Sequence, residues 1–278
     1  MTEHTQTTKR VGVAFLCKEL NRDVADFANE ICRETNYEVF LVIDSWQSAA
    51  QLLETDLFTT VSAEDEDCIR QGYVGCNIAG KETHIQKKVI AWDKMLLHFC
   101  KYESDIDFLW VFEDDVFIPR VETIKNLTEK YSSNDLVTPN NFYKSDSIMD
   151  WHWPHVVDKI KPPYFYSMVC ACGMSRKMLD AVAKYVEQNN RLFYIEVMFN
   201  TIAMQDKSMK VSDPLELKSV VWKGEWGVDE FMLLPNSVFH PIKDVENNAN
   251  RRAEIWVKCV TGYQPNNQLP EFITRLMK

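Results

Sequence analysis

The sequence predicts an α/β domain with a mostly parallel central sheet flanked by helices. Two apolar runs, 11–17 and 38–43, flank a segment whose apolar residues recur at helical spacing, and this order is a β-α-β unit. A third apolar run, 108–112, adds a further strand after another amphipathic segment. The chain has 278 residues, of which 46% are hydrophobic, so it can bury the core of one large α/β domain.

Hydrophobic spacing defines the elements of the first half. Continuous apolar runs predict buried strands, and apolar residues three or four positions apart predict helices. The elements expected in order are strand 11–17, helix 21–34, strand 38–43, helix 84–102, strand 108–112, a helix from Pro119 to about 131 and a short strand at 136–138. Strands joined through helices in this way run parallel.

The second half combines a long loop with shorter elements. Residues 140–163 are rich in aromatic residues, Pro, Asn and His and show little periodicity, which predicts a surface loop suited to binding. The elements expected after it are a strand at 164–172, a glycine turn at 173–175 that opens a helix to about 188, a helix at 195–204, strands at 210–211 and 217–222, and a polar tail from 247. No linker rich in Gly, Ser or Pro divides the chain, so we expect a single domain over 1–278.

Charge and hydropathy exclude several classes of protein. The net charge of −10 argues against a nucleic-acid surface, which would show a basic patch. No apolar run reaches the roughly 20 residues of a membrane span, and the polar N-terminus MTEHTQTTKR lacks the apolar core of a signal peptide. We therefore expect a cytoplasmic protein with no membrane span; its oligomeric state is left open.

The eight cysteines are scattered and form no CxxC pair. A chain of this size does not need disulfides, so we expect reduced core residues in a cytosolic protein. Cys170 and Cys172 are too close together for the usual spacing of zinc ligands, so zinc is not expected there.

The ends of the first two strands mark a ligand edge. Parallel sheets bind ligands at the carboxyl ends of their strands. Cys17, Lys18 and Glu19 follow the first strand, and Asp44 follows the second. We therefore expect these four residues to hold part of a ligand.

Three adjacent carboxylates, Glu113, Asp114 and Asp115, lie inside the apolar run FLWVFEDDVFIP. Burying carboxylates is costly unless something neutralises them. Alternation along an extended chain would point Glu113 and Asp115 the same way, and two such oxygen donors suit Mg²⁺ or Mn²⁺. The alternative is a solvated turn whose acids cap the next helix.

An apolar strand followed by such a triplet resembles the metal-binding motif of GT-A glycosyltransferases, which are nucleotide-sugar-dependent enzymes with a Rossmann-type sheet. In that family the last acid is the most regular metal ligand. The resemblance therefore implies Asp115 as a direct ligand and Glu113 as a second one. Asp114 would face the ribose or a nearby backbone group. The chain has Glu113 where many members have Asp.

Three later segments follow in the family's order, so the resemblance covers about 9–245. The segment around Gly173 resembles the glycine turn over the donor sugar, and the segment around Glu196 resembles the one that supplies the catalytic base. FHPIK, with His240 and Lys243, resembles the C-terminal histidine segment that completes the metal site. Lys243 would reach the phosphates.

The resemblance implies a nucleotide-binding half at about 9–138, an acceptor and catalytic half at about 139–245, and a C-terminal extension at 246–278. The implied metal ligands are Glu113, Asp115 and His240, with Mn²⁺ or Mg²⁺ as the ion. The implied partners are a UDP-sugar donor and a glycan acceptor. The chain is also similar to the compact glycosyltransferases that large algal viruses encode, a resemblance that implies xylose or another small sugar as the transferred group.

The identity of the catalytic base remains open between two segments. Glu196 lies among apolar residues, and burial would raise its pKa toward the range useful for a base. Asp229 and Glu230, in the Gly- and Trp-rich segment 224–230, are the rival acids. If either of them is the base, Glu196 has a structural role.

The aromatic segment WHWPH, 151–155, has two open interpretations. Its rings would stack on sugars, or they would form the small core of a lid. A zinc site from its two histidines is less favoured, because no further Cys or His lies nearby.

We therefore expect an inverting, metal-dependent glycosyltransferase that moves a sugar from UDP to a glycan hydroxyl. The rivals are a metal-dependent nucleotidyltransferase or phosphohydrolase and a non-catalytic sugar-binding protein. Rossmann dehydrogenases, P-loop kinases and α/β-hydrolases are disfavoured, because their GxGxxG, GxxxxGK[ST] and GxSxG motifs do not occur.

Overall fold

The computed structural model describes residues 9–44, 52, 55–77, 89–140, 142–143, 156–222, 224 and 226–265. Its strands are β1 (Val11–Cys17), β2 (Glu38–Ile43), β3 (Thr59–Val61), β4 (Phe108–Glu113), β5 (Leu136–Val137), β6 (Phe142–Tyr143), β7 (Phe165–Tyr166), β8 (Ala171–Ser175) and β9 (Val211–Ser212). Its helices are α1 (Arg22–Glu34), α2 (Asp65–Arg70), α3 (Ala91–Lys101), α4 (Val121–Tyr131), α5 (Arg176–Asn189), α6 (Ile195–Gln205), α7 (Val228–Leu233) and α8 (Asn248–Val260), with short 3₁₀ helices η3 (Leu215–Leu217) and η4 (Val245–Asn247).

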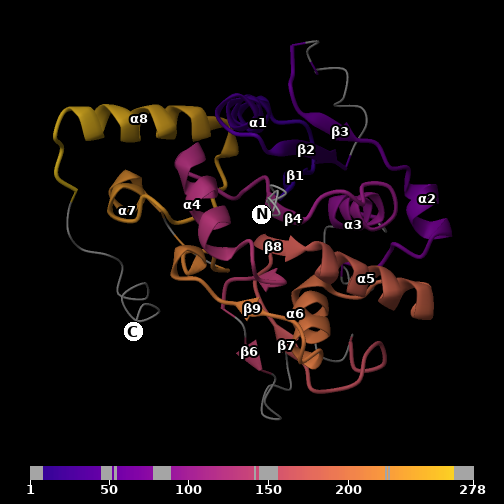
Figure 1. Cartoon of the computed structure of the whole chain (residues 1–278). Coiled ribbons are helices and arrows are strands. Elements are labelled where there is room, and N and C mark those ends of the chain that lie inside the picture. The colour runs from indigo at the N-terminus through magenta and orange to yellow at the C-terminus, as the bar shows by residue number, and fades with distance from the viewer. Residues whose placement is uncertain are drawn as a thin grey trace, which may run out of the picture.

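A seven-stranded sheet of order β3-β2-β1-β4-β8-β5-β9 forms the centre of the molecule (Figure 1). All neighbouring strands pair in parallel except where β8 runs antiparallel to β4 and to β5. The predicted α/β class, with a mostly parallel sheet flanked by helices, is confirmed. A separate antiparallel pair joins β6 and β7.

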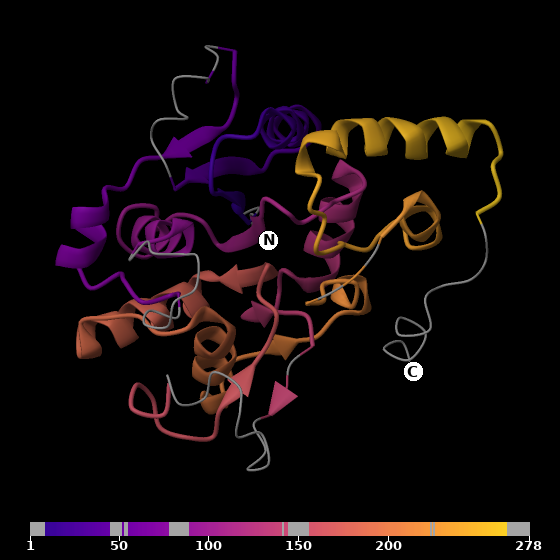
Figure 2. The same ribbon diagram turned by 180° about the vertical axis from the view of Figure 1, so that it is seen from behind.

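Helices cover both faces of the sheet, because alternate residues of β1 point to opposite sides. Val13 and Phe15 pack with residues of α1 and α4. Ala14 and Leu16 pack with residues of α3, α5 and α6. Figure 2 shows α8 above α7 and beside α1, and both neighbours contact it. Within the described part of the chain, no helix is both long and apolar enough to cross a bilayer.

The first half agrees closely with the prediction. β1 and β2 have the expected bounds, and α1 begins one residue late because the Asn21 side chain caps it by accepting a hydrogen bond from the Asp23 backbone N–H. The helix expected over 84–102 is seen as α3 from Ala91, and residues 84–88 lie outside the described residues. β3, α2 and α7, with three, six and six residues, were not predicted.

Two of the strands expected in the second half were wrong. The apolar run 164–172 is not one strand, because a turn at 169–170 separates β7 from β8. The expected strand at 217–222 is replaced by η3 and a single bridge between Val220 and His240. In both cases apolar residues marked burial correctly, but burial does not require an extended chain.

Gly173 is not in a turn, which corrects the expected glycine loop over the donor sugar. It lies inside β8, opposite Trp110 of β4. A Cβ at this position would lie 2.7 Å from Phe108 Cζ and 2.9 Å from Trp110 Cζ3. The glycine is therefore needed for close packing of rings against the sheet.

We expect Gly173→Ala to lower the free energy of unfolding by about 1–3 kcal/mol, because rigid rings must move to admit the methyl group. Urea unfolding followed by circular dichroism measures this change. Gly227→Ala is the matched control, because its Cβ would meet only the flexible end of Glu230, at 3.1 Å. Equal stability of the two variants would contradict the packing account.

Candidate active site

The carboxyl ends of β1, β2 and β4 meet at one edge of the sheet. The Asp44 N–H donates to the Cys17 carbonyl at 2.9 Å, and the Asp114 N–H donates to the Leu16 carbonyl at 3.0 Å. The Lys18 N–H donates to Asp114 Oδ2 at 3.1 Å. The backbone segments expected at a ligand edge therefore lie together. Of the two alternatives for Asp114, the ribose or a nearby backbone group, the structure shows a backbone group, the Lys18 N–H.

A cleft of about 560 Å³ opens at this edge. Lys18 and Glu19 line it together with Asp114, and Val245 and Glu246 close its other side. Cys17, in contrast, is wholly buried, and burial raises the pKa of its thiol. The Cys17 side chain packs in the core, so only its backbone is available at this edge.

The acidic triplet does not continue the strand. β4 ends at Glu113, and Asp114 and Asp115 form a turn, so strand alternation does not orient Glu113 and Asp115 as expected. Glu113 Oε1 accepts a hydrogen bond from Trp92 Nε1 at 2.7 Å. Asp115 instead faces two basic side chains, with Lys243 Nζ at 2.6 Å and His240 Nε2 at 3.3 Å.

His240 is positioned by the backbone. It forms a bridge with Val220, and the neighbouring Phe239 forms one with Phe117. Nδ1 is 2.8 Å from the Val221 carbonyl, which can only accept, so Nδ1 donates and Nε2 faces Asp115. A backbone partner of this kind commonly orients metal-binding histidines.

Charge and burial shift the pKa values of this group of residues. Burial alone would raise the pKa of Asp115, but His240 and Lys243 hold it below its ordinary value. Burial would likewise lower the pKa of His240, and Asp115 outweighs this and raises it. Burial raises the pKa of Asp114 to about 6, although the Lys18 N–H opposes this.

Glu196 lies in the first turn of α6 and belongs to the same neighbourhood. Burial raises the pKa of Glu196 to about 7; a hydrogen bond with Tyr194 lowers it, and the negative charge of Glu113 raises it further. The positive charge of His240 also acts on Glu196. A half-buried carboxyl group with such a pKa is suited to general base chemistry near neutrality.

The rival acids have other partners. Glu230 Oε2 accepts a hydrogen bond from the Gly227 N–H at 2.9 Å and so caps α7. Asp229 hydrogen-bonds Tyr263, just after α8. Glu254 is the main cause of the raised pKa of Lys258 in α8, and Asp229 adds to it. The structure thus groups Glu196, and neither rival, with Glu113 and His240.

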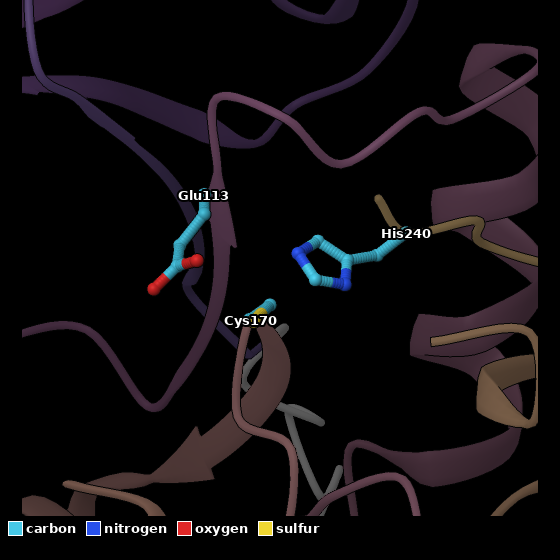
Figure 3. A group of neighbouring side chains, drawn as sticks. All are labelled: Glu113, Cys170 and His240. Carbon is cyan, nitrogen blue, oxygen red and sulfur yellow. The ribbon is translucent and has the colours of Figure 1, made fainter. Parts of the chain in front are cut away.

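Cys170 is a neighbour that the sequence did not reveal. The donor atoms of Glu113, Cys170 and His240 all lie within 4.8 Å of one another, and Figure 3 shows the three side chains converging from separate segments. Burial, and then the charge of Glu113, raise the pKa of the Cys170 thiol. The only signal for this placement is the pairing of β4 with β8, which the sequence alone does not show.

The donors around His240 fit a divalent cation. Two carboxylates, from Glu113 and Asp115, flank the imidazole. Within the described part of the chain, Asp115 Oδ1 is buried without a well-formed hydrogen bond. Carboxylate oxygens and a neutral imidazole nitrogen suit Mn²⁺ and related ions, and a cation would offset the buried negative charge.

The aromatic segment 151–155 lies outside the described residues. Part of the other candidate sugar-binding segment is described. The Trp226 indole donates to the His240 carbonyl at 3.0 Å and packs against Phe239, with ring centroids 5.3 Å apart. Trp226 therefore supports the backbone that carries His240.

Comparisons with known proteins give no close relative. No family model and no curated protein matches the chain. Among solved structures, it is similar to an active-site mutant of LgtC, with 13% identity, coverage of 94% of this chain and 98% of the other, and a TM-score of 0.44. It is also similar to the bifunctional glycosyltransferase WbbM, with 10% identity, coverage of 96% and 53%, and a TM-score of 0.46.

A third similar structure is the 4-diphosphocytidyl-2C-methyl-D-erythritol synthase of Anaerococcus prevotii DSM 20548. The identity is 10%, the coverage is 89% of this chain and 96% of that one, and the TM-score is 0.42. The chain spans only about half of WbbM. All three TM-scores lie below 0.5, and all three identities are 13% or lower.

Proposed function

We propose that the protein is a GT-A-like, metal-dependent glycosyltransferase that moves a sugar from a UDP-sugar to a glycan hydroxyl. The observation that supports this is the grouping of Glu113, Asp115 and His240 at the carboxyl edge of the sheet, with Glu196 beside them. One domain over 1–278 would carry the activity, with the nucleotide-binding half before residue 139.

In this proposal the donor lies along the edge, with the nucleoside near Asp44 and the cleft lined by Lys18 and Glu19. Glu113, Asp115 and His240 hold Mn²⁺ or Mg²⁺. A bound cation of this kind supplies Lewis acidity for the charge that develops on a departing diphosphate. Lys243, already within 2.6 Å of Asp115, adds a second positive charge beside the same oxygens.

Glu196 is the proposed base, and the proposed reaction inverts the anomeric carbon. Glu196 takes the proton of the acceptor hydroxyl as the hydroxyl oxygen forms a bond to the anomeric carbon. The bond between the anomeric carbon and the diphosphate breaks. The resemblance to algal-virus enzymes makes xylose the proposed sugar, a capsid-type glycan the proposed acceptor and the host cytoplasm the proposed location.

We expect kcat/KM at saturating Mn²⁺ to fall by about tenfold per pH unit below about 7, because only ionised Glu196 accepts a proton. The rate falls toward low pH, and not toward high pH, because Glu196 loses its proton only when the pH is above its raised pKa. A pH series of nucleotide release measures this profile. Asp229→Asn should keep the same midpoint, and a wild-type profile that is flat from pH 5.5 to 8 would contradict the assignment.

The nucleotidyltransferase or phosphohydrolase alternative uses carboxylates at a strand end in the same way. Isothermal titration of UDP with and without Mn²⁺ separates the two, since a transferase should bind UDP tightly only with the ion. Turnover of a nucleoside triphosphate without any sugar transfer would favour the alternative instead.

A further inference from the structure

The three-residue group of Glu113, Cys170 and His240, called here the thiol cluster, combines unlike donors. A carboxylate oxygen, a thiol sulfur and an imidazole nitrogen all lie within 4.8 Å of one another (Figure 3). Cys170 is 8% exposed and His240 is 5% exposed. The group is therefore more than an acidic patch, and two of its three members are buried while Glu113 is half-buried.

The backbone places Cys170 directly beside Glu113. β4 pairs antiparallel with β8 up to Phe112 opposite Ala171, and the next pair in that register is Glu113 with Cys170. The Glu113 N–H donates to the Cys170 carbonyl at 2.9 Å, one position beyond the last ladder pair, where Cys170 ends the turn at 169–170. Opposed residues of an antiparallel pair project to the same side. The carboxylate and the sulfur are thus held together by the sheet.

The third member comes from a different segment and is equally constrained. His240 is held by its bridge to Val220 and by the bond from Nδ1 to the Val221 carbonyl. This bond leaves Nε2 as the ring atom available to a metal. Ligands fixed by packed backbone need little rearrangement to bind an ion.

The sulfur also has a fitting partner. The Cys170 thiol hydrogen-bonds the Glu113 carboxylate. A dication bound between them would replace this proton, which leaves to solvent as the metal–sulfur bond forms. Cys172, two residues on, is also buried and near Glu113, but it is not part of the thiol cluster.

We infer that Cys170 is a metal ligand, so that the cation site contains a thiolate and prefers Co²⁺ or Zn²⁺ to Mg²⁺. Thiolate ligands favour Zn²⁺ and similar ions, whereas Mg²⁺ requires oxygen donors. This inference rests on the cation site of the proposed function. It does not depend on which reaction that site performs.

The test is a Co²⁺ titration of the whole protein, because a thiolate ligand gives a sulfur-to-cobalt charge-transfer band in the near ultraviolet. We expect the wild type and Cys172→Ser to show the band at one equivalent and Cys170→Ser to lack it. Cys170→Ser should also lower the ratio of Co²⁺ to Mg²⁺ affinity by at least about tenfold. A band that persists in Cys170→Ser, or a wild type that binds Co²⁺ without the band, overturns the inference.

A second measurement needs no variant, in case Cys170→Ser does not fold. X-ray absorption of the Zn²⁺-loaded wild type should show a sulfur scatterer at about 2.3 Å. A shell of oxygen and nitrogen alone would refute thiolate ligation. If sulfur ligates but no sugar is transferred, the proposed function fails and the inference stands. If sugar is transferred but sulfur does not ligate the metal, the proposed function stands and the inference about Cys170 fails.

Discussion

Asp115→Asn should lower kcat/KM for sugar transfer by roughly 10²–10³-fold. The substitution keeps the shape of the side chain but removes the negative charge that lies 3.3 Å from His240 and 2.6 Å from Lys243. Without it, the cation loses a ligand and Lys243 loses its anchor. Donor-dependent release of nucleoside diphosphate measures the rate, and calorimetry with Mn²⁺ measures the affinity for the ion.

The control for this substitution is Asp105→Asn. Asp105 is exposed, pairs with Arg10 at 2.9 Å and lies before β4 at the opposite edge of the sheet. We expect wild-type activity from it and a melting temperature within a few degrees of wild type for both variants. Nearly full activity of Asp115→Asn would contradict the proposal that Asp115 is a metal ligand needed for transfer. A folded wild type without any transferase activity would favour the sugar-binding alternative.

Glu196→Gln should lower kcat by roughly 10²–10⁴-fold, because the amide cannot accept the acceptor proton. Mn²⁺ and UDP affinity should change little, since Glu196 is not among the proposed metal ligands. Single-turnover rates with saturating donor separate this loss from weaker binding. A variant with a normal rate would assign Glu196 a structural role.

The same substitution has a predicted effect on stability. Because burial raises the pKa of folded Glu196 to about 7, from an ordinary value of 4.5, its ionisation at higher pH destabilises the fold. The contribution of the protonated Glu196 to the free energy of unfolding is fully present below pH 4.5, the pKa of Glu196 in the unfolded chain. It is lost as the pH rises through about 7, the pKa of Glu196 in the folded chain. Glu196→Gln should therefore raise the melting temperature at pH 8 and leave it nearly unchanged at pH 4.

Asp229→Asn and Glu230→Gln are the matched controls for base chemistry. Both acids lie in α7, and their partners are Tyr263, Lys258 and the Gly227 N–H. We expect both variants to transfer sugar, with at most a small loss of stability from Glu230→Gln, because the Gln side-chain oxygen can still accept the Gly227 N–H but without the charge. If only one of them abolished transfer, the base would be that residue instead of Glu196. The anomeric configuration of the product, read by NMR, should be inverted, and retention would remove the role of Glu196 as base.

Much of the sheet was predictable because its central strands are continuous apolar runs. β1 and β2 have the predicted bounds, and β4 extends one residue beyond its prediction, to Glu113. The turn at 169–170 and the 3₁₀ helix η3 were not predictable in this way, because apolar residues are buried in turns as well as in strands.

The site was predictable only where nearby residues or the order of motifs carried the information. Asp114 and Lys18 were expected at one edge, and they share a hydrogen bond. The setting of Gly173 was misjudged and the contact of Cys170 with Glu113 was missed for a common reason: the neighbours of both residues come from β4, about 60 positions earlier in the chain. Strand register is a non-local property, so neither the packing of Gly173 nor the contact of Cys170 with Glu113 is visible in the local sequence.

The most direct test of the central claim is a screen of the wild-type protein against a panel of nucleotide-sugars, with released UDP as the readout and a chelator as the control. The proposed function predicts that UDP is released from at least one UDP-sugar, with UDP-xylose as the first candidate. The release should stop when divalent cations are removed and should return when Mn²⁺ is added. Release that is unaffected by the chelator, or no release from any donor by the folded, Mn²⁺-loaded protein, would contradict a metal-dependent glycosyltransferase.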